Sequence, residues 1–139
     1  MSKVAVIYWS GTGNTEAMAL AVKEGAAAAG AEVALCTPKT FDGSIAAFDA
    51  VAFGCPAMGA EVLEEDLFDP MWQDLKPELA GKNIALFGSY GWGDGEWMRS
   101  WEDEANAAGA NLVAASVMAN EMPADADLAA CRALGAALA

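Results

Sequence analysis

Short apolar runs alternate along this chain with longer segments in which apolar residues recur at helical spacing. Residues 4–9 form a continuous apolar run that ends at Ser10-Gly11, which is typical of a strand buried on both faces of a parallel sheet. Further strands are predicted over residues 32–36, 50–54, 83–88 and 111–117, and helical or turn segments over residues 15–29, 44–48, 67–79, 96–108 and 124–138. Gly30 is placed to end the first helix. Five strands that alternate with helices predict an open, doubly wound α/β fold with helices on both faces of a parallel sheet.

In such a sheet the ligand crevice lies outside the carboxyl ends of the strands, so the loops that follow strands are the first place to look for function. These loops are predicted at residues 10–15, 55–61, 89–95 and 118–123. No internal repeat, long linker or low-complexity tract divides the chain, and 139 residues can bury a core without a disulfide or a metal. We therefore expect residues 1–139 to form a single domain that folds alone.

Charge and composition exclude several classes of function. Seven Lys and Arg against 20 Asp and Glu give a net charge of −13, which nucleic acid and anionic membranes would repel and a basic patch on another protein would attract. The chain has no histidine, so it lacks the usual general base near pH 7, the Ser-His-Asp and Cys-His arrangements and the commonest metal ligand. Neither a nucleic-acid partner nor a metal site is expected.

The cysteines and the apolar runs indicate a compartment. Cys36, Cys55 and Cys131 are odd in number, and their spacing fits neither a zinc motif nor a secreted disulfide framework. They are interpreted as reduced thiols of a cytoplasmic protein. No apolar run approaches the roughly 18 residues of a membrane span, and the N-terminal segment lacks the features of a secretory signal.

The first of the four loops, residues 10–15, has the composition of a phosphate cradle. Its glycines let backbone N–H groups converge, its hydroxyls add donors, and the helix that follows favours an anion at its N-terminus. The P-loop motif fails because its Gly-Lys-Ser/Thr ending is absent, and the Rossmann fingerprint fails because Glu16 stands where a small residue is needed. The alternative is an ordinary turn with a helix cap, although four capping side chains in six residues exceed what capping requires.

The second and third loops place large side chains next to glycines. The Met58 thioether can lie flat on an aromatic ring, although a lone methionine can equally fold inward, and Gly59 lets the peptide after Met58 take either of two orientations. Trp92 stands between glycines, where no helix or strand stripe would bury it. Across one crevice, Met58 and Trp92 would enclose a planar heterocycle. With a phosphate site at the other end, flavin mononucleotide (FMN) fits better than adenine or guanine nucleotides, which usually bring a metal or a lysine.

The other tryptophans and a cysteine are assigned to packing. Trp97 and Trp101 are four residues apart on one helix face, which is typical of a core. Trp9 and Trp72 are also assigned to packing, and Cys55 to a buried, unreactive thiol.

Three stretches of the chain resemble a known family. Residues 8–16 (YWSGTGNTE), 54–59 (GCPAMG) and 86–93 (LFGSYGWG) resemble the cofactor loops of short-chain flavodoxins from anaerobic bacteria. Similarity continues through residues 95–98 and 120–123, so it spans nearly the whole chain. The resemblance implies a flavodoxin-like sheet of strand order 2-1-3-4-5, with FMN bound non-covalently where the order reverses.

The resemblance also implies where the cofactor lies. Its phosphate would sit on residues 10–15, its isoalloxazine ring between Met58 and Trp92, and the ring edge against backbone groups of Gly59 and Gly91 and the Glu61 carboxylate. Ala60 departs from relatives, which usually carry a polar residue there. No catalytic residue is expected. The expected cofactor-binding residues are Ser10, Gly11, Thr12, Gly13, Asn14, Thr15, Pro56, Ala57, Met58, Gly59, Ala60, Glu61, Ser89, Tyr90, Gly91, Trp92, Gly93 and Asn120.

The function implied by the resemblance is that of a low-potential one-electron carrier rather than an enzyme, shuttling mainly between the semiquinone and the hydroquinone of FMN. The carbonyl of the flexible glycine, here Gly59, would turn to accept a hydrogen bond from the reduced flavin. Acidic residues would disfavour the anionic hydroquinone and would dock the protein, as a monomer, on basic patches of redox partners.

Two other functions of similar folds were considered. An FMN-dependent quinone or azo reductase needs room for a second substrate above the flavin ring, and nothing in the chain supplies it. A receiver-like signalling domain requires acidic residues after its strands, where this chain has Ser10, Cys55 and Ser89.

Overall fold

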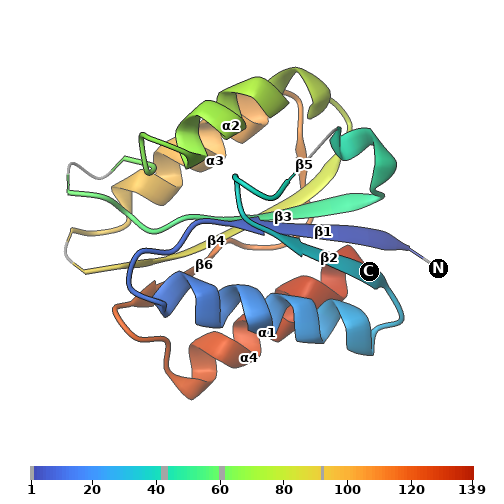
Figure 1. Ribbon diagram of the computed structural model, residues 1–139. Helices are drawn as coiled ribbons and strands as arrows, with labels where there is room; N and C mark the ends of the chain where they lie inside the picture. Colours follow the sequence, from blue (N-terminus) through green and yellow to red (C-terminus); the bar gives the residue numbers. More distant parts are fainter. Residues whose placement is uncertain (1, 42–43, 60–61, 92) are drawn as a thin grey trace.

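The sheet is built around β1 (Lys3–Tyr8), whose last five residues are all buried. In the computed structural model, which describes residues 2–41, 44–59, 62–91 and 93–139, β1 pairs in parallel with β2 (Glu32–Cys36) on one side and β3 (Ala50–Gly54) on the other. β3 pairs in turn with β4 (Asn83–Tyr90), so the order along the sheet is β2-β1-β3-β4-β5. The predicted doubly wound parallel sheet of order 2-1-3-4-5 is confirmed (Figure 1).

The last position of the sheet is filled by two short strands, where a single strand over residues 111–117 was predicted. β5 (Asn111–Leu112) pairs with the start of β4, and β6 (Val117–Asn120) pairs with its end. Leu112 and Val117 are five residues apart, whereas their partners on β4, Ile84 and Phe87, are three apart. Two residues between β5 and β6 therefore have no partner in the ladder and form a bulge. As a result, the strand runs on to Asn120 and brings the residues after it to the carboxyl edge of the sheet.

Two pairs of helices cover the two faces of the sheet. α1 (Asn14–Ala28) and α4 (Asp125–Leu138) lie on one face, and α2 (Phe68–Leu75) and α3 (Glu96–Ala107) lie on the other (Figure 1). The segment predicted as a helix over residues 67–79 divides into α2 and the 3-10 turn η2 (Lys76–Glu78), because Pro77 has no amide with which to continue the helical ladder. The segment predicted over residues 44–48 is another 3-10 turn, η1 (Ile45–Ala47).

α1 and α4 approach each other closely because each has a glycine at the contact. A Cβ atom on Gly25 would lie 1.9 Å from the carbonyl oxygen of Arg132, and one on Gly135 would lie 2.0 Å from that of Val22. Gly30 follows the last turn of α1 as predicted, with a φ of 99°, in the region that favours glycine.

The core under α2 and α3 contains the tryptophans that were assigned to packing. Trp72, Trp97 and Trp101 are each at most 1% exposed, as predicted. The ring of Trp72 meets those of Phe53 and Trp101 edge to face, with centroids 5.2 and 5.7 Å apart. No helix within the described residues is long and apolar enough to cross a membrane.

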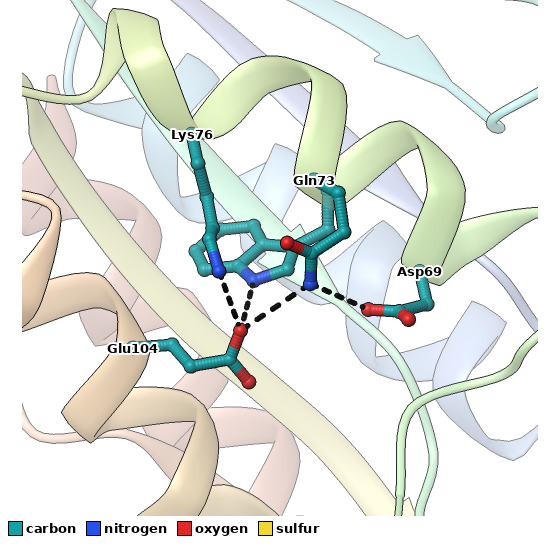
Figure 2. Close-up of polar contacts among 5 residues, drawn as sticks. Asp69, Gln73, Lys76 and Glu104 are labelled. Carbon is teal, nitrogen blue, oxygen red and sulfur yellow. Dashed lines mark hydrogen bonds and ion pairs between the residues drawn. The ribbon is translucent and has the colours of Figure 1, made fainter.

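A single carboxylate oxygen ties α2 to α3. Glu104 Oε1, on α3, accepts hydrogen bonds from Lys76 Nζ at 2.9 Å, from the Trp72 indole at 3.3 Å and from the Gln73 amide at 3.4 Å (Figure 2). Gln73 also donates to Asp69 one turn earlier on α2 (Figure 2). α2 is therefore held both by its apolar face and by its polar edge.

Candidate functional site

A cavity of about 560 Å³ opens at the carboxyl edge of the sheet, within the size range of small-molecule sites. The loops after β1, β3, β4 and β6 line it, which are the four loops singled out from the sequence. The lining residues are Trp9, Gly11, Thr12, Asn14, Pro56, Ala57, Met58, Ser89, Tyr90, Gly91, Glu121 and Met122.

The first loop is organised around the side chain of Ser10. Ser10 Oγ accepts hydrogen bonds from the amides of Gly13 at 3.1 Å and Glu16 at 3.2 Å, which closes the turn before α1. Among the described residues, the amides of Thr12, Asn14 and Thr15 have no acceptor. Free amides at a helix N-terminus form a ready-made anion site. Ser10 therefore shapes the loop, and the amides near it remain free to bind an anion.

Thr15 is buried and bonded within the protein. Its hydroxyl lies 3.0 Å from that of Ser89 and accepts the Ser89 amide at 3.3 Å. Both residues were predicted to bind the cofactor. The structure brings them together, but only Ser89 lines the cavity. The pair joins the loop that offers amides to the loop that follows β4.

The second loop carries Met58 to the cavity wall, as predicted. Pro56, Ala57 and Met58 are half-buried and line the cavity, whereas Gly59 is exposed and does not line it. The predicted ligands Ala60 and Glu61 lie outside the described residues.

Cys55, at the base of the second loop, is fully buried and is not among the lining residues, in agreement with the prediction. Burial raises the pKa of its thiol to about 12, so it is protonated at neutral pH.

The third loop brings Tyr90 and Gly91 to the cavity, as predicted. The ring of Tyr90 packs against Trp97, with centroids 5.5 Å apart, so the aromatic wall continues into the core. Gly93 is exposed and does not line the cavity, and Trp92, the predicted aromatic half of the ring clamp, lies outside the described residues.

Asn120 lies next to the cavity but does not line it. Its amide Nδ2 donates to the Tyr90 carbonyl at 3.3 Å, and the Glu121 backbone N–H donates to the same oxygen at 2.7 Å. Glu121 has a φ of 59°, an uncommon conformation for a residue with a side chain. After this turn Met122 reaches the cavity, with its side chain 78% exposed.

Trp9, Glu121 and Met122 line the cavity although none was predicted to do so. Trp9 was assigned to packing as the last residue of the first apolar run; β1 ends one residue earlier, so Trp9 begins the loop and its half-buried ring lies against Gly11. The sequence could have placed Trp9 in the loop only if it had shown that the strand ends at Tyr8, and an apolar run defines the end of a strand only to within a residue or two. Met122 lies in a predicted functional loop, but a single methionine there carried no further signal.

Glu16, whose position excluded the Rossmann fingerprint, is turned away from the cavity. Its carboxylate accepts a hydrogen bond of 3.0 Å from the Tyr8 hydroxyl and lines a separate cavity of about 440 Å³ behind the first loop. Burial, and then the hydrogen bond to Glu16, raise the pKa of Tyr8. The Glu16 carboxylate therefore does not line the cavity that Thr12 and Asn14 line.

The cavity suits FMN in its volume and in the chemistry of its two ends. Free amides and the Thr12 hydroxyl at one end suit a phosphate, and the half-buried side chains of Met58 and Tyr90 at the other suit a flat apolar ring. No Lys or Arg lines this cavity among the described residues, so backbone N–H groups and a helix N-terminus would hold the phosphate. Within the part of the chain that the structure describes, no group of His, Cys, Asp or Glu side chains is arranged to hold a metal ion.

Comparison with known proteins agrees with this assignment. The protein-family model described as Flavodoxin matches residues 6–135. The flavodoxin of Megasphaera elsdenii is 45% identical over 137 residues, which cover 98% of each chain. The flavodoxin of Clostridium beijerinckii is 42% identical over 125 residues, which cover 88% of this chain and 89% of the relative.

The fold is shared with solved structures of the same kind. The solution structure of two-electron reduced Megasphaera elsdenii flavodoxin matches with a TM-score of 0.87 at 44% identity, covering 97% of each chain. A flavodoxin from the domain Archaea matches with a TM-score of 0.82 at 26% identity, covering 98% of this chain and 95% of the other.

Proposed function

Because this chain belongs to the flavodoxin family, and is therefore an FMN-binding carrier of electrons to redox partner proteins, we propose that it works as a low-potential one-electron carrier whose cofactor lies in the 560 Å³ cavity. FMN, when bound, supplies the redox chemistry. The protein supplies binding, orientation and the electrostatic surroundings.

The observation that carries this proposal is the contrast between the two ends of the cavity. One end offers N–H groups and hydroxyls, and the other offers a thioether and an aromatic ring. A site of this kind can hold a phosphorylated flat ring, while among the described lining residues there is no nucleophile paired with a base. Binding and tuning of a cofactor is the chemistry that these residues support best.

Individual site residues are assigned on the same grounds. The phosphate lies on the amides and hydroxyls of residues 10–15, and the ring packs against Met58 and Tyr90. From the resemblance of the loops to those of flavodoxins, we further propose Trp92 for the opposite wall and Gly59, Ala60 and Glu61 for the ring edge. Asn120 acts through the Tyr90 carbonyl, which its side chain contacts.

Negative charge around the cavity supports a low potential. Glu121 lines the cavity, Glu65 and Asp66 are exposed between the second loop and α2, and Asp94 is exposed in the loop that leads to α3. An electron added to a ligand in this field is disfavoured by Coulomb repulsion, which salt screens. We therefore place the working couple at the second electron, and expect its potential to rise with ionic strength.

A stepwise reduction of the purified holoprotein, followed by absorbance, tests the proposal. A yellow protein that passes through a distinct one-electron-reduced form before bleaching is the expected result. A protein that stays colourless after incubation with excess FMN, or that bleaches in one two-electron step, would overturn it.

The alternative, a quinone or azo reductase, predicts that the holoprotein by itself oxidises NADPH. We propose instead that it has no catalytic activity of its own and passes electrons only to protein partners. Rapid NADPH oxidation by the pure holoprotein, in the absence of a reductase, would favour the enzyme.

The remaining features are proposed from composition and surface. We propose that residues 1–139 form one domain that works as a monomer. We also propose that it works in the cytoplasm, which is supported by its three free thiols. The acidic surface, with a net charge of −13, docks basic patches on partners. Partner reduction rates should then fall as ionic strength rises, and rates that ignore salt would contradict the docking proposal.

A further inference from the structure

The loop after β3 carries Met58 to the cavity along a limb that continues the sheet. The Cys55 amide donates to the Phe87 carbonyl at 3.1 Å, and the Ala57 amide donates to the Ser89 carbonyl at 3.0 Å. The chain then turns, and the Met58 amide donates to the Val62 carbonyl at 2.9 Å. The outgoing limb is thus part of the sheet, whereas the returning limb needs an anchor of its own.

Glu64 supplies that anchor. Its side chain is only 5% exposed, and its carboxylate accepts three backbone hydrogen bonds, from Asp66 at 2.8 Å, Leu67 at 2.7 Å and Phe68 at 2.8 Å. The Glu64 carbonyl also accepts the Asp69 amide at 2.8 Å. Burial by itself would raise the pKa of Glu64, but the three N–H donors outweigh it and the pKa lies below its ordinary value. The carboxylate is therefore charged and fully engaged at neutral pH.

The same residue joins the two limbs of the loop. The Glu64 backbone N–H donates to Cys55 Sγ at 3.4 Å, so the end of the returning limb is bonded to the start of the outgoing one. Cys55 is fully buried, and its backbone carbonyl accepts the Trp97 indole N–H at 3.2 Å. The loop is closed at its base by one N–H···S contact between two buried residues.

The helix that Glu64 caps is a fixed frame. Phe68 and Trp72 of α2 are fully buried, and Lys76 and Gln73 are held by Glu104 of α3 (Figure 2). Because α2 cannot shift easily, an anchor on its N-terminus fixes the returning limb relative to the sheet.

We propose that Glu64, through the amides it caps, and Cys55, through the amide of Glu64, are positioning residues for cofactor binding, which hold the loop closed and Met58 at the cavity wall. Neither side chain lines the cavity, so both act through the loop. The inference rests on the proposed place of Met58 in the FMN site.

The decisive variant is Glu64→Gln, with Glu65→Gln as its matched control. Leu67 and Phe68 both donate to Oε1 and Asp66 donates to Oε2, so Gln, which has an NH₂ group in place of one oxygen, loses at least one of the three bonds and the charge while the size is kept. Glu65 is the next residue, is exposed, and has no hydrogen bond among the described residues, so its change removes the same charge without the cap. The Kd of the apoprotein for FMN, from quenching of flavin fluorescence, should rise about fivefold in Glu64→Gln, the factor that corresponds to one lost hydrogen bond. It should stay within about twofold in Glu65→Gln.

A second control separates a positioning role from stability alone. The Ser44 hydroxyl accepts the Ala46 amide at 3.0 Å and caps η1, which precedes β3 at the opposite edge of the sheet, so Ser44→Ala removes a cap without touching the site. If Glu64→Gln and Ser44→Ala lose similar stability but only the first weakens FMN binding, the proposal holds. If both leave the Kd unchanged, Glu64 is a structural cap only and the proposal is wrong.

Hydrogen exchange of the wild-type protein gives a test that needs no variant to fold. By thermodynamic linkage, if the Glu64 cap strengthens FMN binding, bound FMN must stabilise the Glu64 cap by the same factor. The Leu67 and Phe68 amides should exchange about fivefold more slowly in the holoprotein than in the apoprotein, after correction by the Ala46 amide, which Ser44 caps away from the cavity. Equal slowing of all three amides would overturn the proposal.

Cys55 and Met58 complete the test. Cys55→Ala removes the sulfur acceptor and should raise the Kd in the same direction as Glu64→Gln, with partial rescue in Cys55→Ser. Met58→Ala distinguishes the two levels of inference. If it leaves the Kd unchanged, the site assignment itself fails; if it raises the Kd while Glu64→Gln behaves like Glu65→Gln, only the positioning role fails.

Discussion

Thr15 and Ser89, 74 residues apart in the chain, share a buried hydrogen bond of 3.0 Å between their hydroxyl groups. Thr15 belongs to the first turn of α1 and Ser89 to the end of β4, so this bond links the two ends of the cavity. The distance between the phosphate loop and the aromatic loop is thus set inside the protein before a ligand arrives.

Thr15→Val should lower the free energy of unfolding by about 1–3 kcal/mol, because it leaves the Ser89 amide and hydroxyl buried without a partner. It should also weaken FMN binding. Urea denaturation and an FMN titration measure the two effects. Thr12→Val is the control, since Thr12 is exposed at the cavity and should affect FMN binding alone. Equal stability of the two variants would contradict the role given to Thr15.

Gly25→Ala and Gly135→Ala should each destabilise the protein by about 2–3 kcal/mol. Elsewhere in a helix the same change usually stabilises, by roughly 1 kcal/mol. Here the new Cβ would lie 1.9 Å or 2.0 Å from a carbonyl oxygen of the facing helix, so α1 and α4 would have to separate. Thermal or chemical denaturation reports the sign, and a stabilised Gly25→Ala variant would refute the close contact.

In the folded protein only Cys36 should react with a thiol reagent at pH 8. Burial raises the pKa of Cys55 and of Cys131 to about 12, so neither thiolate is populated, whereas Cys36 is partly exposed even though burial also raises its pKa. A disulfide-exchange assay should count one slowly reacting thiol in native protein and three after unfolding. The Cys36→Ser variant should titrate close to zero in the native state.

Glu104 should contribute to stability at neutral pH and lose that contribution in acid. Burial opposes its charge, but hydrogen bonds from Lys76, Trp72 and Gln73 outweigh this and hold its pKa below the ordinary value. A carboxyl whose pKa is lowered by folding stabilises the protein above its unfolded pKa, about 4.3 for Glu, and stops doing so as pH falls through the folded pKa.

The difference in unfolding free energy between wild type and Glu104→Gln should therefore be greatest near pH 7 and shrink below about pH 4.3. Asp103→Asn, an exposed acid on the same helix, controls for the general relief of surface repulsion on charge removal. A difference that is independent of pH would show that the charge of Glu104 is not what binds α2 to α3.

Gly59→Val should leave the fold intact and change the redox behaviour. Gly59 is exposed and, apart from its chain neighbours, no atom of the described residues lies within 4 Å of the place where its Cβ would be, so the unfolding free energy should stay within about 0.5 kcal/mol. The bulkier residue restricts the peptide after Met58, so the variant should bind FMN but accumulate less of the one-electron-reduced form. An unchanged maximum of that form in a reductive titration would discard this role for the glycine.

The fold and the place of the site were predictable because they depend on local patterns. Fully apolar runs can be buried only between two layers of helices, and alternation with helical segments leads to a parallel sheet whose ligand edge lies at the ends of the strands. The loops around Ser10, Met58 and Tyr90 were identified from their glycines and hydroxyls, which act through the backbone near them. The resemblance to flavodoxins added the strand order and supported the cofactor that the loop residues already favoured.

Four features of the site were decided by tertiary contacts that no short-range sequence pattern specifies. In each of them, the local sequence of a residue carries no sign of its partner. The four features are the pairing of Thr15 with Ser89, the bulge that brings Met122 to the cavity, the turn of Glu16 toward Tyr8, and the closure of the loop by Glu64 and Cys55.

What the sequence alone determined is therefore the set of elements, the edge of the sheet at which a phosphorylated ring can bind, and the acidic character of the surface. Only the tertiary structure decided which hydroxyls and amides stay free for the ligand and which are used within the protein. The reason is physical: periodicity and turn chemistry act over a few residues, whereas a buried hydrogen bond depends on where the sheet brings its two partners.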